Sequence, residues 1–214
     1  MLCLGCFASP FAVHAATNRF EPEILKFEKE DQVTSPPLHG ILFVGSSTIH
    51  YWKVKELFPD LPVFNRGFGG SEVSDVIYYF DRVVAPYHPD TIVFYSGDND
   101  ISAGKTTTTV VNDVKKFVSM VHKELPTTRL IIFPPKPSVA REKLWPEMKQ
   151  VGDEEKKLAK TDSHVTLLDT TPDMLSPEGR PRPELLRKDG LHMNAKGYKI
   201  WSDKLRPLLK AKKN

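Results

Sequence analysis

The stretch Ile41-Leu42-Phe43-Val44-Gly45-Ser46-Ser47-Thr48 decides the fold that this sequence encodes. Its first four residues form a short apolar run without polar alternation, which is typical of a strand covered on both faces. Gly45 ends the run, and the two serines that follow stand where a helix begins. We therefore expect the first unit of a parallel sheet in which each strand leads into a helix.

Four more apolar runs have the same character as the first. Each is short and continuous, and each ends near Gly, Pro, Asn or Asp. They are Val63–Phe64, Thr91–Tyr95, Leu130–Phe133 and Val165–Leu168. Together with Ile41–Val44 they predict a five-stranded, mostly parallel sheet with right-handed crossovers.

The segments between these runs show the spacing of amphipathic helices. A helix over roughly Glu21–Glu30 precedes the first strand, and Lys196–Leu209 closes the chain. The apolar stripes that indicate helices comprise Val73, Val76, Ile77 and Phe80; Val110, Val114, Phe117, Val118 and Val121; and Tyr198, Trp201, Leu205 and Leu208. Strands that alternate with helices predict an α/β domain, and no repeat or shift in composition indicates a second one.

Length and composition fit one globular domain. The chain has 214 residues, of which 40% are hydrophobic and 27% charged. The formal net charge is only +3, so we expect neither nucleic acid nor an anionic membrane as a partner. No run after the first residues approaches the ~18–20 apolar residues of a spanning helix, so no stable membrane span is expected. The oligomeric state stays open.

The first residues indicate a targeting segment. Residues 1–16 carry no Asp, Glu, Lys or Arg, and Val13-His14-Ala15 resembles a small-residue cleavage site. We expect residues 1–15 to be a signal segment and residues 16–214 a single domain, which implies a secreted or periplasmic protein. No Lys or Arg precedes the apolar run, so a cytoplasmic protein is the alternative. Cys3 and Cys6 are the two cysteines, so the expected mature chain has neither a disulfide nor a thiol nucleophile.

Polar residues after the strands locate the site, because ligands bind at the carboxyl ends of parallel strands. Ser47 follows the first strand at a helix start, where backbone N–H groups stabilise a developing oxyanion. An ordinary helix N-cap is the alternative for these serines. After the second strand, Gly67, Gly69 and Gly70 allow the backbone to approach a ligand closely. A flexible turn would use the same glycines.

Two further motifs lie at the same predicted edge. After the third strand, the amide of Asn99 can donate to a substrate oxygen, although an Asx turn would also use it. Just before the last helix, Asp189-Gly190-Leu191-His192 can place a carboxylate against one imidazole nitrogen and leave the other free as a base. His50 is near Ser47 in the sequence, but we expect no carboxylate to orient it. The remaining histidines lie in the N-terminal segment, before strands or in a helix: His14, His39, His88, His122 and His164.

Taken together, Gly45-Ser46-Ser47, Gly70, Asn99 and Asp189-x-x-His192 resemble, in order and spacing, the four blocks of the SGNH (GDSL-like) hydrolases. The resemblance runs from about Ile41 to Tyr198. The segments Phe43–Trp52 and Asn65–Glu72 are similar to the branch that includes the platelet-activating-factor acetylhydrolase catalytic subunits. The family usually has Gly-Asp-Ser in its first block, whereas this chain has Ser46 in place of Asp. Alignment of the glycine makes Ser47 the expected nucleophile and Ser46 a structural substitute.

The resemblance implies a three-layer flavodoxin-like fold with strand order 2-1-3-4-5. It also implies a carboxylic ester hydrolase that works through an acyl-enzyme, with Ser47, Asp189 and His192 as a catalytic triad. The backbone N–H groups of Ser47 and Gly70 and the side chain of Asn99 would form the oxyanion hole. No cofactor or metal is implied, and no spacing of Asp, Glu or His indicates one. An acyltransferase using the same residues is the nearest alternative.

Two more distant functions are possible alternatives to ester hydrolysis. Gly104-Lys105-Thr106 resembles part of a phosphate-binding loop, but that loop needs glycine at the position of Asn99. A catalytically dead carbohydrate-binding module on the same fold would not need every residue of the reaction, and all of them are present. We therefore expect a small-molecule or carbohydrate ester as the partner.

The acyl group is expected to be short, such as acetyl, on a polar alcohol such as a sugar. The strands and their connections use nearly the whole chain and leave no sizeable insertion for an apolar lid. The longest connection, Pro134 to His164, combines basic and aromatic residues suited to a polar ligand, with Tyr51 and Trp52 as a second aromatic surface. The residues of that connection are Lys136, Arg141, Lys143, Leu144 and Trp145. Ordinary packing is the alternative for both tryptophans.

Overall fold

The computed structural model describes residues 17–210, so the expected signal segment and both cysteines lie outside the described residues. The described chain contains a five-stranded sheet. Its strands are β1 Ile41–Gly45, β2 Val63–Gly67, β3 Thr91–Tyr95, β4 Arg129–Ile132 and β5 Val165–Leu167. They lie in the order β2-β1-β3-β4-β5, and every neighbouring pair is parallel. The strands, their order and the fold class expected from the sequence are confirmed.

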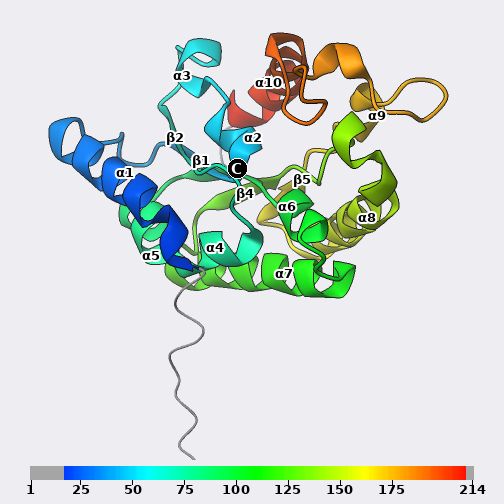
Figure 1. The fold of residues 1–214 in the computed structure, drawn as a ribbon. Coiled ribbons are helices and arrows are strands. Elements are labelled where there is room, and N and C mark those ends of the chain that lie inside the picture. Colours follow the sequence, from blue (N-terminus) through cyan, green and yellow to red (C-terminus); the bar gives the residue numbers. More distant parts are fainter. Residues whose placement is uncertain (1–16, 211–214) are drawn as a thin grey trace, which may run out of the picture.

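Helices cover both faces of the sheet and form three layers. One face holds α1 Glu21–Val33, α4 Val73–Tyr78, α5 Phe80–Val83, α7 Thr107–Glu124 and α8 Trp145–Thr161. The other holds α2 Ser47–His50, α3 Val54–Leu57, α9 Thr171–Met174 and α10 Ala195–Lys210. Figure 1 shows α3 and α10 above the sheet and α4, α5 and α7 below it. A short helix, α6 Asp98–Ser102, follows β3, and single 3₁₀ turns occupy Thr17–Phe20, Ala85–Tyr87, Val139–Leu144 and Pro183–Leu185.

The continuous apolar character of the strands follows from this layering. In β1, Leu42 and Val44 face the core on the α7 side, while Ile41 and Phe43 face the core on the α10 side. All four side chains are buried. Each buried side chain of this size stabilises the fold by about 1.5–3 kcal/mol relative to an exposed one.

The core on the α10 side is aromatic. Phe133 stacks on Trp201 with the ring centroids 4.5 Å apart, and Trp52 packs at an angle to Trp201 at 5.7 Å. The Trp52 indole also donates a hydrogen bond of 3.0 Å to Ser202 Oγ. Because Trp52 is only 2% exposed, the expectation that it offers an aromatic surface to a sugar is wrong.

The connection between β4 and β5 contains α8, a helix that the sequence reading did not identify. Pro146 stands in its first turn, and Met148 and Val151 are buried against the core on the α7 side. Trp145 begins the helix and packs against the same core. Trp145 therefore has the packing role that is the alternative to a sugar contact.

The turn from β1 into α2 depends on glycine. Gly45 has φ 138°, and a Cβ atom there would lie 1.9 Å from the carbonyl oxygen of Tyr95 on the neighbouring strand. The next residue, Ser46, donates its backbone N–H to that oxygen at 3.0 Å. The two strand ends are thus joined directly, and Ser47 is fixed at the carboxyl edge of the sheet.

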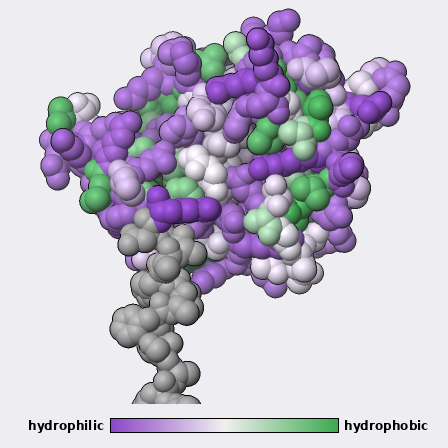
Figure 2. Space-filling model, viewed as in Figure 1, coloured by the Kyte–Doolittle hydropathy of each residue, from purple (hydrophilic) through white to green (hydrophobic). Residues whose placement is uncertain are grey.

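The surface viewed in Figure 2 is mainly hydrophilic, with apolar residues in scattered patches. Across residues 17–210, no helix combines the length and the apolar character that crossing a membrane requires.

Candidate active site

Ser47 is the first residue of α2 and lies at the end of the central strand β1. Ser46 precedes it in an extended conformation, with φ −82° and ψ −162°. The hydroxyl of Ser46 is buried and has no hydrogen-bond partner within residues 17–210. The hydroxyl of Ser47, in contrast, lies 3.1 Å from Nε2 of His192. Of the two serines, it is Ser47 whose side chain contacts the imidazole.

The loop before α10 holds a carboxylate in a fixed orientation. Asp189 Oδ1 accepts hydrogen bonds from the backbone N–H groups of Leu191 at 2.9 Å and His192 at 3.0 Å. Its other oxygen lies 2.8 Å from His192 Nδ1. Partial desolvation raises the pKa of Asp189, but the hydrogen bonds from His192 and from these N–H groups outweigh it and lower the pKa to about 2. Asp189 is therefore an anion that can only accept hydrogen bonds.

This anion fixes the tautomer of His192. Because Asp189 accepts, Nδ1 of His192 carries the proton, and the neutral ring presents an unprotonated Nε2 to the Ser47 hydroxyl. The ring is further held by Tyr51, whose plane meets it edge to face. The arrangement is one in which the hydroxyl can donate its proton to an oriented base.

The loop after β2 lies beside the end of β1. Phe68 donates its backbone N–H to the carbonyl of Gly45 at 3.0 Å, and Gly70 adopts φ 80°, in the left-handed region that favours glycine. The backbone N–H groups of Ser47 and Gly70 donate to no other group in the described part of the chain. Both are free to donate to a bound oxygen.

Asn99 lies in the first turn of α6, after β3. Its Nδ2 donates a hydrogen bond of 2.9 Å to the carbonyl of Ser71, in the glycine-rich loop, and its Oδ1 accepts one of 2.8 Å from Arg141. The Asn99 side chain therefore binds Ser71 and Arg141 and does not form the Asx turn that was the alternative. The structure thus brings the motifs of Ser47, Gly70, Asn99 and Asp189-x-x-His192 to one edge of the sheet.

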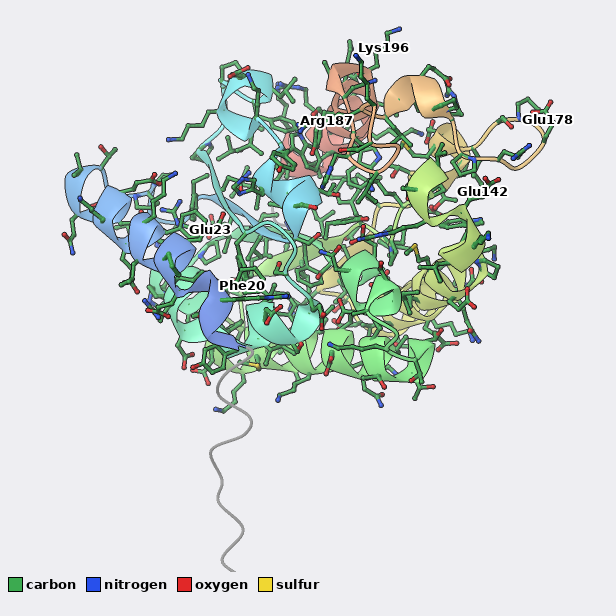
Figure 3. The ribbon with its side chains drawn as sticks, in the orientation of Figure 1. Phe20, Glu23, Glu142, Glu178, Arg187 and Lys196 are labelled. Carbon is green, nitrogen blue, oxygen red and sulfur yellow. The ribbon has the colours of Figure 1, made fainter. Side chains whose placement is uncertain are left out.

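His50 differs from its expected surroundings. Its Nδ1 lies 3.0 Å from Glu23 Oε1, on α1, and 3.1 Å from the carbonyl oxygen of Gly67. The hydrogen bond with Glu23 is the main cause of a raised pKa for His50. The expectation that no carboxylate orients His50 is therefore wrong, because a helix far away in the sequence supplies one. Figure 3 labels Glu23 on α1 and Arg187 on the loop before α10, on different sides of α2.

Two basic residues of the β4–β5 connection lie deeper than the sequence indicated. Lys136 is buried, forms no ion pair within residues 17–210, and lies 5.9 Å from the ring centroid of Tyr95. Burial lowers the pKa of this lysine. Arg141 binds Asp98 and Asn99. Lys136 is therefore not exposed to a sugar, and the sequence gives no signal for the partners of Arg141 beyond the basic character of the segment.

The segment that resembled a phosphate-binding loop is occupied by ion pairs. Lys105 Nζ lies 2.8 Å from Asp100, 3.0 Å from Glu72 and 3.4 Å from Asp113. A lysine surrounded by three carboxylates is not available to a phosphate, which argues further against that interpretation.

Within residues 17–210, one group of side chains could hold a metal ion, and it lies at the opposite edge of the sheet from Ser47. His122, Asp162 and His164 each offer a ligand atom, and these atoms lie within 4.8 Å of one another. The spacing in the sequence gave no indication of this group, because α8 separates His122 from the other two residues.

One groove in the described part of the chain lies outside the triad. It has a volume of about 940 Å³ between α1 and the segment from His50 to Glu56, and its lining includes neither Ser47 nor Asp189 nor His192. The active site is therefore assigned from the geometry of its side chains and not from the volume of a cavity.

Comparison with known proteins gives a family and a set of related folds. The model of the GDSL-like lipase/acylhydrolase family matches residues 49–200, a range that includes Asp189 and His192 and begins two residues after Ser47. No curated protein matches the chain.

Several solved structures share the fold. A Streptococcus pneumonia protein with the provisional name platelet activating factor is 21% identical, with a TM-score of 0.79 over 94% of this chain and 100% of that one. A GDSL-like lipase from Bacteroides thetaiotaomicron is 15% identical, with a TM-score of 0.74 over 87% of this chain and 97% of that one. An acetyl xylan esterase is 19% identical, with a TM-score of 0.67 over 78% of this chain and 98% of that one.

Proposed function

Since the chain belongs to the GDSL-like lipase/acylhydrolase family and is a carboxylic ester hydrolase, we propose that Ser47, His192 and Asp189 form its catalytic triad. The observation that carries the proposal is the continuous series of contacts from Asp189 Oδ2 to His192 Nδ1, at 2.8 Å, and from His192 Nε2 to Ser47 Oγ, at 3.1 Å. Both distances lie within hydrogen-bond reach, so Ser47 can transfer its proton to His192 while Asp189 orients the ring.

In the first half of the reaction, Ser47 Oγ attacks the carbonyl carbon of the ester. His192 Nε2 accepts the hydroxyl proton as the new C–O bond forms, and Asp189 stabilises the imidazolium. The tetrahedral intermediate then breaks its bond to the alcohol oxygen. His192 returns the proton to that oxygen, so the alcohol leaves and the acyl group stays on Ser47.

In the second half, water takes the place of the alcohol. His192 accepts a proton from the water as its oxygen attacks the acyl carbon, and the bond to Ser47 Oγ breaks. The proton passes to Ser47, and the carboxylic acid leaves.

Negative charge on the carbonyl oxygen is stabilised by an oxyanion hole. The proposed donors are the backbone N–H groups of Ser47 and Gly70, which have no other acceptor within residues 17–210, and the second N–H of the Asn99 amide. Removing one such donor in a comparable site costs about 10²–10³ in kcat, so we expect Asn99→Ala to lower kcat by this factor and to change KM little.

The substrate is proposed to carry a short acyl group, such as acetyl, on a polar alcohol such as a sugar. The similarity in fold to an acetyl xylan esterase agrees with the proposal, although a shared fold does not specify a substrate.

The experiment is a p-nitrophenyl ester series from acetate to palmitate, compared by kcat/KM for the wild type, Ser47→Ala and Ser46→Ala. We expect the maximum at the shortest chains, no turnover by Ser47→Ala, and substantial turnover by Ser46→Ala. Retained turnover by Ser47→Ala would contradict the triad. A maximum at eight carbons or longer would contradict the short acyl group and leave the triad intact.

An acyltransferase would use the same residues, because an alcohol can replace water in the second half. The two are distinguished by adding a sugar or glycerol acceptor and measuring the ratio of transferred to hydrolysed acyl groups. We propose hydrolysis as the main reaction and expect free acid to predominate.

We also propose that residues 1–15 are removed as a signal segment, which leaves residues 16–214 as one domain outside the cytoplasm. The uncharged, largely apolar composition of residues 1–16 supports this. Mass spectrometry of the protein from its own cells should find Ala16 at the N-terminus. An intact Met1 in the cytoplasmic fraction would contradict the proposal.

A further inference from the structure

Arg141 forms two hydrogen bonds at the edge of the proposed oxyanion hole. Its Nη1 donates to Asp98 Oδ2 at 2.9 Å, and its Nη2 donates to Asn99 Oδ1 at 2.8 Å. The Arg141 side chain is 14% exposed and that of Asp98 is 4% exposed. Because a guanidinium forms its best hydrogen bonds in a fixed planar geometry, Asp98 holds Arg141 against the amide of Asn99.

These contacts determine which way the Asn99 amide points. Arginine can only donate, so it requires the oxygen of the amide, and the Ser71 carbonyl can only accept, so it requires the nitrogen. A flipped amide would place N–H groups against the guanidinium and an oxygen against a carbonyl. The observed orientation leaves the second N–H of Nδ2 free for the substrate.

We infer that Arg141 is a positioning residue that holds Asn99 in the orientation of an oxyanion donor. This inference rests on the proposed function. A hydrogen bond from a cation to Oδ1 also draws electron density from the amide and strengthens its N–H groups as donors. Arg141 itself does not touch the reacting atoms.

The segment that carries Arg141 also contacts the other half of the site. The backbone N–H of Ala140 donates to the carbonyl of Gly190 at 3.0 Å, within the loop that holds Asp189 and His192. A Cβ atom on Gly190 would lie 3.3 Å from the Cβ of Val139, so the two segments pack closely. The turn Val139–Leu144 therefore joins the oxyanion side of the site to the acid–base side.

The test is a double-mutant cycle with Arg141→Met and Asn99→Ala on p-nitrophenyl acetate. Arg141→Met alone should lower kcat by about 10- to 100-fold and leave KM within a factor of about two, because misplacing a catalytic donor acts on the transition state. In the Asn99→Ala background, Arg141→Met should have almost no further effect. Arg141→Lys should recover part of the loss and serves as the second variant if Arg141→Met does not fold.

The matched control is Arg180→Met. Arg180 pairs with Glu142, on the same turn as Arg141, at 3.1 Å, and Glu142 is labelled in Figure 3. Its removal should leave kcat unchanged. If Arg141→Met lowered kcat by the same factor in the wild type and in the Asn99→Ala background, the inference would be overturned. The proposed function has a different test, because it would be contradicted by activity that persists in Ser47→Ala.

A second inference concerns His122, Asp162 and His164, at the opposite edge of the sheet, and does not depend on the first. His122 Nε2 lies 3.3 Å from Asp162 Oδ2, and it is buried with no hydrogen-bond partner within residues 17–210. His164 Nδ1 lies 3.9 Å from Asp162 Oδ1. No Lys or Arg of the described chain pairs with Asp162, so its negative charge faces two imidazoles.

We propose that these three side chains bind one Zn²⁺ ion. Imidazole nitrogens and a carboxylate oxygen are ligands that Zn²⁺ prefers, and ligand atoms about 2.0–2.1 Å from the ion in a tetrahedron lie about 3.3–3.4 Å apart. The pair of His122 and Asp162 already has this separation. The side chain of His164 is 53% exposed and can rotate to close the remaining distance, and water can take the fourth position. The ion would join the end of α7 to the start of β5.

The test is titration of the full chain with ZnCl₂, followed by calorimetry and by thermal unfolding. We expect the wild type to gain about 3–6 °C in Tm at a Zn²⁺ concentration ten times Kd, because an ion that binds only the folded protein stabilises it. The double variant His122→Ala/His164→Ala should lose one equivalent of bound Zn²⁺ and the whole gain.

The control is His39→Ala, which removes an exposed histidine that lies 3.4 Å from Asp90. It should keep the full gain in Tm. Any Zn²⁺ bound elsewhere in the chain is common to all the variants, so the comparison between variants accounts for it. An unchanged Tm in the wild type, or an equal gain in the double variant, would overturn the proposal.

Discussion

The Tyr51 ring packs edge to face against the His192 imidazole, with the ring centroids 5.0 Å apart and the planes at 84°. The guanidinium carbon of Arg187 lies 4.3 Å from the centroid of the same Tyr51 ring. Tyr51 directly follows α2, whose first residue is the nucleophile, and Arg187 comes from the loop of His192. The tyrosine therefore links the two segments that must stay in register for the proton to move between Ser47 and His192.

This contact predicts that the ring of Tyr51 matters and its hydroxyl does not. Tyr51→Phe should keep kcat/KM close to the wild-type value, whereas Tyr51→Ala should lower it by about 2- to 10-fold, which corresponds to an aromatic pair worth about 0.5–1.5 kcal/mol. The measurement is steady-state hydrolysis of p-nitrophenyl acetate. Equal activity in the two variants would show that the ring contact does not orient His192.

The second prediction concerns the charge of Asp189. Asp189→Asn should lower kcat by about 10⁴, because an amide can donate to Nδ1 and stabilise the wrong tautomer of His192. With a pKa of about 2, Asp189 stays ionised at every pH above 4, so its own titration should not shape the activity profile between pH 5 and 9. The loss in Asp189→Asn should thus be equally large at pH 6 and pH 9.

Asp169→Asn is the control, because Asp169 accepts a hydrogen bond from Thr171 on the surface and makes no contact with the triad. It should leave kcat unchanged. If Asp189→Asn kept more than a tenth of the wild-type activity, the Asp189 carboxylate would contribute little to orienting His192.

The third prediction concerns Glu155, on α8, whose carboxylate is buried with no hydrogen-bond partner within residues 17–210. Burial raises the pKa of Glu155 well above its usual range. The folded protein then binds the proton more tightly than the unfolded chain, so stability is highest below the unfolded pKa of about 4.3 and falls as pH rises toward the folded value. Glu155→Gln should remove this dependence.

The free energy of unfolding should therefore be compared between wild type and Glu155→Gln at pH 4, 6 and 8. We expect the stability gained by the variant to grow with pH, since groups common to both proteins cancel. The neighbouring Glu154 pairs with Lys157 on the surface, so Glu154→Gln should show no such trend. A constant difference from pH 4 to 8 would contradict the raised pKa.

The fourth prediction concerns Gly45, which needs both its φ of 138° and its missing side chain. Gly45→Ala should cost at least about 3 kcal/mol of stability or prevent folding, because the strained φ costs about 1–2 kcal/mol and the clash adds more. Gly104 has a positive φ of 89° but open space around it, so Gly104→Ala should cost only about 1–2 kcal/mol. The free energy of unfolding is measured in urea. If Gly45→Ala and Gly104→Ala lost the same amount, the close approach to Tyr95 would not constrain Gly45.

The sheet could be predicted from the sequence because its strands are buried on both faces. Runs such as Ile41–Val44 and Thr91–Tyr95 stay apolar throughout, and this pattern is hard to confuse with a surface helix. The contact between Asp189 and His192 could also be predicted, since the two residues lie three positions apart on a glycine-containing loop.

Contacts between distant segments could not be predicted in this way. Glu23 approaches His50 because α1 packs beside the end of β2, and Arg141 approaches Asn99 because the turn after β4 folds back over α6. Helix α8 was missed because a buried glutamate, Glu155, interrupts the apolar stripe that would have identified it. In each case the decisive information lies in tertiary packing, which a local pattern does not record.

The most direct test of the proposed reaction is to find which serine is the nucleophile. The full chain is treated with a fluorophosphonate probe, digested, and analysed by mass spectrometry, with Ser47→Ala and Ser46→Ala in parallel. The contact of Ser47 Oγ with His192 Nε2 and the buried hydroxyl of Ser46 predict one adduct, on Ser47, in the wild type and in Ser46→Ala, and none in Ser47→Ala. An adduct on Ser46, or labelling that persists in Ser47→Ala, would contradict the account.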